Sequence, residues 1–323
     1  MITGANSEVD SFADDVLSGL SETPKHLSSR YFYDAEGSRL FLEIMKLPEY
    51  YLTRAETSIF KTHSVEICNA FLEFASGGID IFELGAGDGA KTAILIERLL
   101  EMKARFSYLP IDISEEANDI LVRRFARRFP NLRIAPQTGN YLEILDSLKL
   151  KSERRKVILF LGSNIGNFGQ PSADKFFNRL RAAMNPGDLL FIGFDLQKDP
   201  KTILAAYDDS KGVTRAFNLN LLARINRELG GDFDLNLFSH FAIYNPADGA
   251  ARSFLISRKR QAVHIAALGK TFYFQIWEPI FMEISQKYTR QMIVEQARRS
   301  GFAIKRDFVE PDYYYVDSLW QAV

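Results

Sequence analysis

The chain has 323 residues, with 40 Lys and Arg against 41 Asp and Glu, which gives a formal net charge of −1. At about 150 residues per domain, this length predicts two domains or one large domain with an insertion. The balanced charge offers no positive field for nucleic acid or an anionic membrane, and a hydrophobic content of 46% excludes general disorder.

Residue types that would anchor a disulfide, a metal or a membrane are scarce. The single cysteine, Cys68, cannot form an internal disulfide and favours a reducing, cytoplasmic compartment. The four histidines stand far apart, without the spacing of a zinc site. No apolar run reaches the length of about 18 residues that a membrane span needs, and the first ten residues do not read as a signal peptide. We therefore expect a soluble, cytoplasmic, metal-free globular protein whose function has to be inferred from its motifs.

Apolar spacing in the first two thirds of the chain predicts an α/β fold. Helical periods dominate up to residue 75. The predicted strands that follow are residues 79–84, 106–111, 132–134, 157–161 and 188–194, and the helices between them are 90–103, 115–128 and 172–184. Strands that alternate with helices of this length indicate βαβ units and a mostly parallel sheet.

The alternation ends near Pro200. Residues 202–207 and 213–229 have helical patterns, and residues 241–244, 253–257 and 262–265 have the pattern of antiparallel strands. A final helix over 289–300 and a strand over 312–318 would return to the main sheet. We therefore predict a main domain of residues 60–196 and 286–323, and a smaller α+β domain of residues 1–59 and 197–285.

A glycine loop follows the first predicted strand of the main domain. It reads Glu83-Leu84-Gly85-Ala86-Gly87-Asp88-Gly89, and such a loop lets a ligand approach the backbone. A dinucleotide fingerprint would place its third glycine three residues after the second, whereas here the interval is two. The loop is instead similar to motif I of class I S-adenosylmethionine-dependent methyltransferases. A plain strand-to-helix turn is the alternative interpretation.

The ends of the next strands carry polar residues that suit a nucleoside. Asp112 ends the second strand, where its carboxylate could accept both hydroxyl protons of a ribose. Asn140 and Tyr141 follow the third strand, where an amide and an aromatic ring could hold adenine. Each of the three could also be an ordinary turn or cap residue.

Other polar groups suggest a substrate site. Residues 161–167 (LGSNIGN) form a polar turn after the fourth strand, and an asparagine amide there can donate to a carboxylate. Glu283 and Ser285 alternate with an isoleucine in a strand-like segment, so we expect both on one face, where they could bind the two nitrogens of an imidazole. The alternative is the solvent face of an ordinary strand.

Long motifs in this chain resemble those of the histidine Nα-methyltransferases of ergothioneine biosynthesis. The motifs are residues 31–35 (YFYDA), 48–56 (PEYYLTRAE), 160–167 (FLGSNIGN), 206–209 (AYDD), 216–220 (AFNLN), 225–229 (INREL) and 283–288 (EISQKY). They run nearly end to end in the family's order and at similar spacing. The resemblance implies a class I, Rossmann-like methyltransferase domain with a smaller α+β substrate-binding domain. It also implies a monomer that trimethylates the α-amine of L-histidine to hercynine.

The resemblance assigns roles to individual residues. The implied cofactor residues, for S-adenosyl-L-methionine and its product S-adenosyl-L-homocysteine, are Gly85, Ala86, Gly87, Lys91, Asp112, Asn140 and Tyr141. The implied substrate residues are Tyr33, Tyr50, Gly162, Asn167, Tyr207, Ser253, Glu283 and Ser285.

Within the substrate set, Asn167 and Tyr207 match the positions that hold the substrate carboxylate. Glu283 and Ser285 match the pair that binds the imidazole. Tyr50 matches a tyrosine beside the α-amine and is the candidate catalytic residue.

Tyr33 would lie near Tyr50, and Gly162 would line the transfer site. Three features depart from the family pattern: the residues Ala86, Asp88 and Gly89 in the glycine loop, Asn140 in place of a frequent Asp, and Ser253 in place of a frequent Met.

Other functions remain as alternatives. An N-methyltransferase for another aromatic amino acid, such as tryptophan, is the nearest one, although an indole offers no second nitrogen to Glu283 and Ser285. A dinucleotide-dependent dehydrogenase and a binding module without activity are more distant ones.

Overall fold

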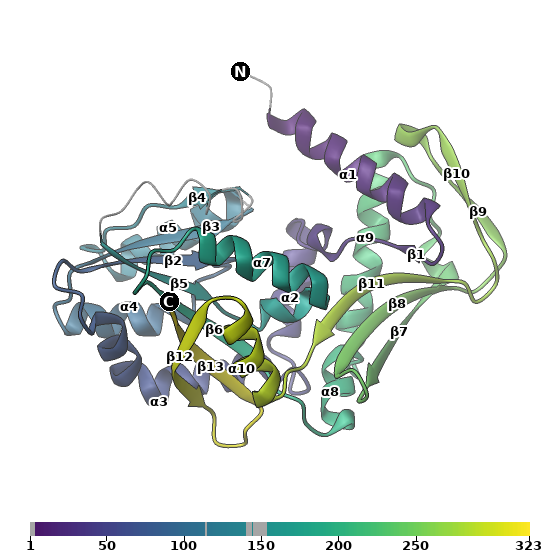
Figure 1. Cartoon of the computed structure of the whole chain (residues 1–323). Coiled ribbons are helices and arrows are strands. Elements are labelled where there is room, and N and C mark those ends of the chain that lie inside the picture. The colour runs from purple at the N-terminus through teal and green to yellow at the C-terminus, as the bar shows by residue number, and fades with distance from the viewer. Residues whose placement is uncertain (1–3, 114, 140–143, 145–153) are drawn as a thin grey trace. The chain divides into compact units, whose positions relative to one another are not determined.

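The computed structural model describes residues 4–113, 115–139, 144 and 154–323 (Figure 1). The chain divides into two compact units. Unit 1 comprises Met1–Tyr51 and Lys198–Ser285, and unit 2 comprises Leu52–Gln197 and Gln286–Val323. Both units therefore draw on separate segments of the sequence.

Unit 2 is built on a sheet that has seven strands in the described part of the chain, in the order β12-β13-β6-β5-β2-β3-β4. The strands are β2 (Ile79–Leu84), β3 (Phe106–Asp112), β4 (Gln137–Thr138), β5 (Arg155–Phe160), β6 (Leu189–Asp195), β12 (Phe302–Val309) and β13 (Tyr315–Ala322). The five neighbouring strands β4, β3, β2, β5 and β6 are parallel to one another. Strand β13 is antiparallel to both of its neighbours, β6 and β12.

Helices cover both faces of this sheet (Figure 1). The helices are α3 (Leu52–Leu72), α4 (Thr92–Glu101), α5 (Glu115–Arg128), α7 (Gln170–Ala182) and α10 (Arg290–Arg299). Helices α7 and α10 pack on alternate β6 residues such as Leu190 and Ile192. Phe191, which points the other way, contacts Phe60 and Phe71 of α3. Nearly continuous apolar strands are therefore buried on both sides, as a parallel sheet requires.

Unit 1 combines helices with a small sheet. Its helices are α1 (Gly4–Ser21), α2 (Ala35–Ile44), α8 (Pro200–Tyr207) and α9 (Val213–Leu229). Its strands are β1 (Lys25–His26), β7 (Phe238–Asn245), β8 (Ala250–Ser257), β9 (Gln261–Ile265), β10 (Lys270–Phe274) and β11 (Pro279–Gln286). The sheet order is β1-β11-β8-β7, with β9 and β10 as a separate hairpin. Leu221 and Ile225 of α9 pack with Leu255, Ile280 and other apolar residues of the sheet in one core.

Several predicted elements differ from the structure. The weak strand predicted over 132–134 is wrong, because Ile134 makes only an isolated bridge to Tyr108 and the strand lies at β4. The strand predicted over 312–318 is displaced to β13. Strand β12 was not predicted, because charged residues interrupt its apolar pattern on an exposed edge.

The predicted domain boundary after residue 59 also differs from the division between the units. Residues 52–59 form the start of α3, which is one continuous helix in unit 2. Because a helix buried along its length against one sheet moves with that sheet, these eight residues go with unit 2.

Candidate active site

The glycine loop joins β2 to α4 at the carboxyl edge of the parallel strands. Gly85, Gly87 and Gly89 have φ angles of 71°, 54° and 63°, in the left-handed region that favours glycine. A Cβ placed on Gly87 would meet no atom of the described residues within 4 Å, so none of them fills the space above this peptide. The loop can therefore accept a ligand against its backbone, which is the condition a cofactor needs.

Asp112 ends β3 beside this loop. Its Oδ2 accepts a 3.1 Å hydrogen bond from the Gly87 amide, and its carbonyl accepts one of 3.0 Å from the Gly139 amide. The carboxylate is thus held at the rim of the open space, where the sequence predicted a ribose ligand. Its chemistry fits a diol, because each carboxylate oxygen accepts a hydroxyl proton. Asn140 and Tyr141 lie outside the described residues.

Glu83, two residues before the first glycine of the loop, is held by two buried hydrogen bonds. It is 3% exposed, and its two carboxyl oxygens accept hydrogen bonds of 2.6 Å from Thr92 Oγ1 and 2.5 Å from Tyr108 OH. Burial raises the pKa of Glu83 to about 7, despite the two hydroxyl donors that lower it. Glu83 therefore connects β2, β3 and the first residue of α4, and fixes the geometry of the loop.

Lys91, the residue before α4, points its ammonium group at a buried carboxylate. Its Nζ pairs with Oε2 of Glu56, which comes from α3 and is fully buried. Oε1 of Glu56 accepts a 2.8 Å hydrogen bond from the Gly162 amide and a 2.9 Å bond from Tyr315 OH. The sequence motifs included Glu56 but assigned it no role, since its partners lie far away in the sequence.

The turn after β5 lies next to the glycine loop. Gly162 has a φ of 75°, and a Cβ there would lie 3.5 Å from Lys91 Nζ. A Cβ on Gly85 would lie 3.5 Å from Asn164 Nδ2, in the short helix Asn164–Asn167. The side chain of Asn167 makes no hydrogen bond to any residue in the described ranges and is half-buried. The two turns that the sequence singled out in unit 2 therefore meet at one sheet edge.

In unit 1, Tyr207 and Ser285 are in direct contact. The Tyr207 hydroxyl, at the end of α8, donates a 2.7 Å hydrogen bond to Ser285 Oγ on β11. Asp209, two residues after Tyr207, fixes the start of α9, because its carboxylate accepts hydrogen bonds from the Val213 and Thr214 amides. Glu283, two residues before Ser285 on β11, is half-buried.

The two predicted tyrosines of the N-terminal segment share one neighbour. The Phe41 ring meets Tyr33 edge-on at 5.4 Å between centroids and Tyr50 at 6.2 Å. Asp34, next to Tyr33, caps α2 at the Gly37 amide and accepts a 2.7 Å bond from Asn220 Nδ2. Ser253 is 2% exposed and pairs with Ala242 across the β7–β8 ladder.

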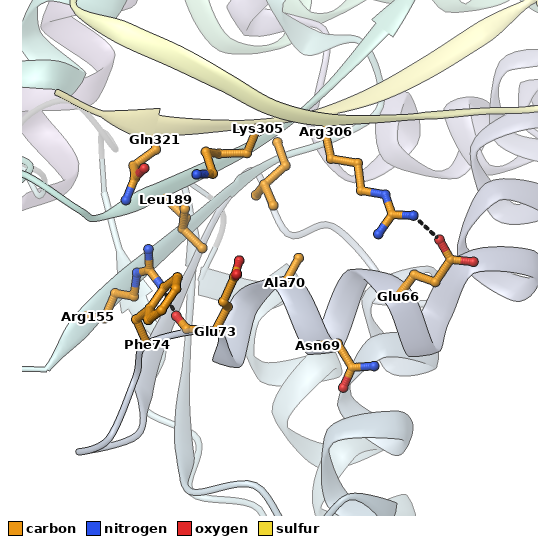
Figure 2. A pocket seen from close by; sticks show the side chains of 11 residues that line it. Glu66, Asn69, Ala70, Glu73, Phe74, Arg155, Leu189, Lys305, Arg306 and Gln321 are labelled. Atoms are coloured by element: carbon orange, nitrogen blue, oxygen red, sulfur yellow. Dashed lines mark hydrogen bonds and ion pairs between the residues drawn. The ribbon is translucent and has the colours of Figure 1, made fainter.

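A separate pocket of 590 Å³ lies at the opposite end of the unit 2 sheet (Figure 2). It is lined by the first residues of β5 and β6, Arg155 and Leu189, with Phe74 at the end of α3. Arg306 points across it to an ion pair with Glu66. None of the predicted site residues that the structure describes lines this pocket.

The single cysteine and the acidic and histidine side chains of the described residues offer no further chemistry at this site. Burial raises the pKa of the Cys68 thiol to about 12, so this group stays protonated at neutral pH. Among residues whose placement is described, no three His, Cys, Asp or Glu side chains are grouped to hold a metal ion. In the same part of the chain, no helix combines the length and apolarity needed to cross a bilayer.

The comparison with protein families decides the identity of the fold. A family model described as histidine-specific methyltransferase, SAM-dependent, matches residues 12–322. The chain belongs to this family. The predicted family, the class I α/β fold and the use of S-adenosyl-L-methionine are thereby confirmed.

Individual methyltransferases are similar to this chain over most of their length. The chain is 35% identical to a histidine N-alpha-methyltransferase of Mycolicibacterium smegmatis, over 95% of this chain and 94% of that one. It is 36% identical to one of Mycobacterium tuberculosis, over 89% and 87% of the two chains. An L-tryptophan methyltransferase of Psilocybe serbica is 26% identical, over 85% and 82%.

Proposed function

We propose that this enzyme transfers methyl groups from S-adenosyl-L-methionine to the α-amine of L-histidine, three times in succession, to give hercynine for ergothioneine biosynthesis. The observation that carries the proposal is the end-to-end similarity to two histidine N-alpha-methyltransferases at 35% and 36% identity. The similarity to the tryptophan enzyme is lower, at 26%.

The residues of unit 2 fit the cofactor. Asp112 would accept the ribose hydroxyl protons, and the open backbone at Gly87 would let the ligand approach. Lys91 would hold the carboxylate of the amino-acid moiety. The cofactor supplies an electrophilic methyl group on a sulfonium, so the chain mainly has to position the amine and exclude water.

The residues of unit 1 fit an imidazole. A neutral imidazole has one N–H donor and one nitrogen acceptor, and Glu283 would accept from the first. Ser285 would donate to the second, because its oxygen already accepts the proton of Tyr207. An indole ring has no acceptor nitrogen, so this donor would have no partner in a tryptophan complex.

The amine has to lose a proton before each transfer to it. Tyr50 would contact the amine and orient its lone pair, with Tyr33 nearby, and water would carry the proton away from it. Asn167 would donate its amide protons to the substrate carboxylate, a group it can bind without adding charge.

We also propose that the enzyme acts as a cytoplasmic monomer on a free amino acid. A net charge of −1 supports a partner that needs no strong surface field, and a single cysteine supports a reducing compartment. Light scattering should give the mass of one chain, 36.8 kDa, and a mass twice as large would contradict the monomer.

Separate assays of the twenty amino acids test the substrate. The enzyme is incubated with methyl-labelled S-adenosyl-L-methionine and each of the twenty amino acids in turn. We expect label on histidine alone. Label on tryptophan but not on histidine would replace the proposal by its nearest alternative.

A further inference from the structure

Glu56 is a fully buried carboxylate that no step of the proposed reaction uses. Its two oxygens accept hydrogen bonds from the Gly162 amide, the Tyr315 hydroxyl and the Lys91 ammonium group. These donors come from the turn after β5, from β13 and from the end of the glycine loop. One side chain of α3 thus connects three segments at the carboxyl edge of the sheet.

The surrounding charges leave Lys91 as the cation of this cluster. Asp317 on β13 is fully buried, and neither of its oxygens accepts a hydrogen bond within the described residues. Burial, together with the charge of Glu56, raises the pKa of Asp317 well above its usual value. Burial lowers the pKa of Lys91, but the Glu56 carboxylate outweighs this and raises it, so that the amine stays charged.

A glycine on β6 leaves the space that the side chains of Glu56 and Tyr315 occupy. A Cβ on Gly193 of β6 would lie 2.3 Å from Tyr315 OH and 2.5 Å from Glu56 Oε1. Only glycine fits there while both groups keep their positions. Because buried ion pairs are often no more stabilising than apolar residues of the same volume, stability alone does not account for this arrangement.

Lys91 is more exposed to solvent than Glu56, its ion-pair partner. Its side chain is 23% exposed, whereas that of Glu56 is not exposed at all. The Lys91 side chain is therefore partly accessible, whereas the carboxylate that pairs with it is fully buried. A Cβ on Gly162 would lie 3.5 Å from Lys91 Nζ, which shows how closely the turn after β5 approaches.

We propose that Glu56 is a positioning residue, which holds the Lys91 ammonium group in place for the carboxylate of S-adenosyl-L-methionine. The inference rests on the proposed role of Lys91 in that function. A lysine has a long, flexible side chain, and fixing it on binding costs conformational entropy. Glu56 orders the side chain before the ligand arrives, which lowers that cost. The same carboxylate fixes the Gly162 amide, so the cofactor loop and the turn after β5 keep one geometry.

Binding of S-adenosyl-L-homocysteine to the full chain, measured by calorimetry, tests this inference without catalysis. In Glu56→Gln the amide can still accept from Gly162 but presents N–H groups to Lys91. We expect the dissociation constant to rise at least about tenfold, which is the loss of one charge-assisted hydrogen bond. The KM for histidine should change by less than about twofold, since the imidazole residues belong to unit 1.

A double-mutant cycle separates positioning from a structural role. Lys91→Met removes the charge at nearly constant length and should weaken binding to a similar extent. If Glu56 acts through Lys91, adding Glu56→Gln to Lys91→Met should cause no further loss. Equal, additive losses would overturn the inference, as would wild-type affinity in folded Glu56→Gln.

Two further variants complete the design. Glu66→Gln, on the exposed side of the same helix, is the matched control and should leave affinity and activity unchanged. If Glu56→Gln does not fold, Tyr315→Phe decides: it removes one donor to Glu56 and should weaken binding about threefold. Unchanged affinity in that variant would then overturn the inference.

Wild-type enzyme that binds S-adenosyl-L-homocysteine but leaves histidine unmethylated would refute the proposed function and leave the test of Glu56 intact.

Discussion

The hydroxyl of Tyr207 donates a hydrogen bond of 2.7 Å to Ser285 Oγ, at a corner where both side chains are nearly buried. Because the Ser285 oxygen accepts this proton, its own proton is directed to another acceptor. Tyr207 therefore sets the direction in which Ser285 donates. This relationship makes the two residues a coupled pair rather than two independent contacts.

The coupling predicts non-additive kinetics. Ser285→Ala and Tyr207→Phe should each raise the KM for histidine about five- to tenfold, through loss of a hydrogen bond worth about 1 kcal/mol or more. The double variant should be no worse than the more severe single variant by more than about twofold. Steady-state kinetics on the three variants measure this, and a fully multiplicative effect would show that the two residues act separately.

Glu283 should contribute more to histidine affinity than either hydroxyl. Removal of one partner of a desolvated charge contact typically costs about 2–5 kcal/mol, so Glu283→Ala should raise the KM for histidine at least about tenfold. The affinity for S-adenosyl-L-homocysteine, measured by calorimetry, serves as the internal control and should stay the same. An unchanged KM would mean that Glu283 does not bind the imidazole.

Gly193→Ala should destabilise the protein. Its new methyl group would overlap the Tyr315 hydroxyl and Glu56, and overpacking of this kind costs about 1–3 kcal/mol. Gly77→Ala is the matched control, because a Cβ at Gly77 meets no atom within 4 Å. Denaturant unfolding of both variants measures the difference. Equal stability of the two would show that the cluster around Glu56 is less rigid than described.

The raised pKa of Glu83 predicts a pH dependence of stability. Burial holds this carboxyl protonated in the folded state up to about pH 7, whereas its ordinary pKa is 4.5. The folded state binds the proton more tightly, so the contribution is complete below pH 4.5 and is lost as the pH rises to about 7. At most about 3 kcal/mol is involved.

The variant Glu83→Gln isolates this effect. Its amide stays neutral, so the free energy of unfolding of the wild type should fall relative to the variant between pH 4.5 and 7. Chemical denaturation at several pH values measures the difference between the two proteins, in which the other titrating groups cancel. A difference that does not depend on pH would contradict the assignment.

The sequence predicted those parts of the fold that local pattern controls. The strands β2, β3, β5 and β6 are buried on both faces and are therefore mostly apolar runs, easily distinguished from the helices between them. Strand β12 carries charged residues in its middle, and its place is set by pairing with β13, which no local pattern reveals. The predicted boundary after residue 59 differs from the division between the units, because the helical pattern of α3 weakens before Ser58 although the helix begins at Leu52.

Some residues of the candidate site could be predicted from local sequence, and others could not. Glycines with positive φ and the aspartate that ends β3 follow from motif and strand position. Glu56 could not be assigned a role, because its partners Gly162 and Tyr315 lie 106 and 259 residues away. The one available signal was the position of this glutamate at the end of the motif of residues 48–56.

The identity of the methylated product decides whether the enzyme trimethylates the α-amine of histidine. Purified enzyme, L-histidine and excess S-adenosyl-L-methionine are incubated, and the product is examined by mass spectrometry with fragmentation. We predict histidine that carries three added methyl groups on the α-nitrogen, with the imidazole unmodified. Methyl groups on the imidazole, or unmodified histidine beside methylated tryptophan, would contradict the account.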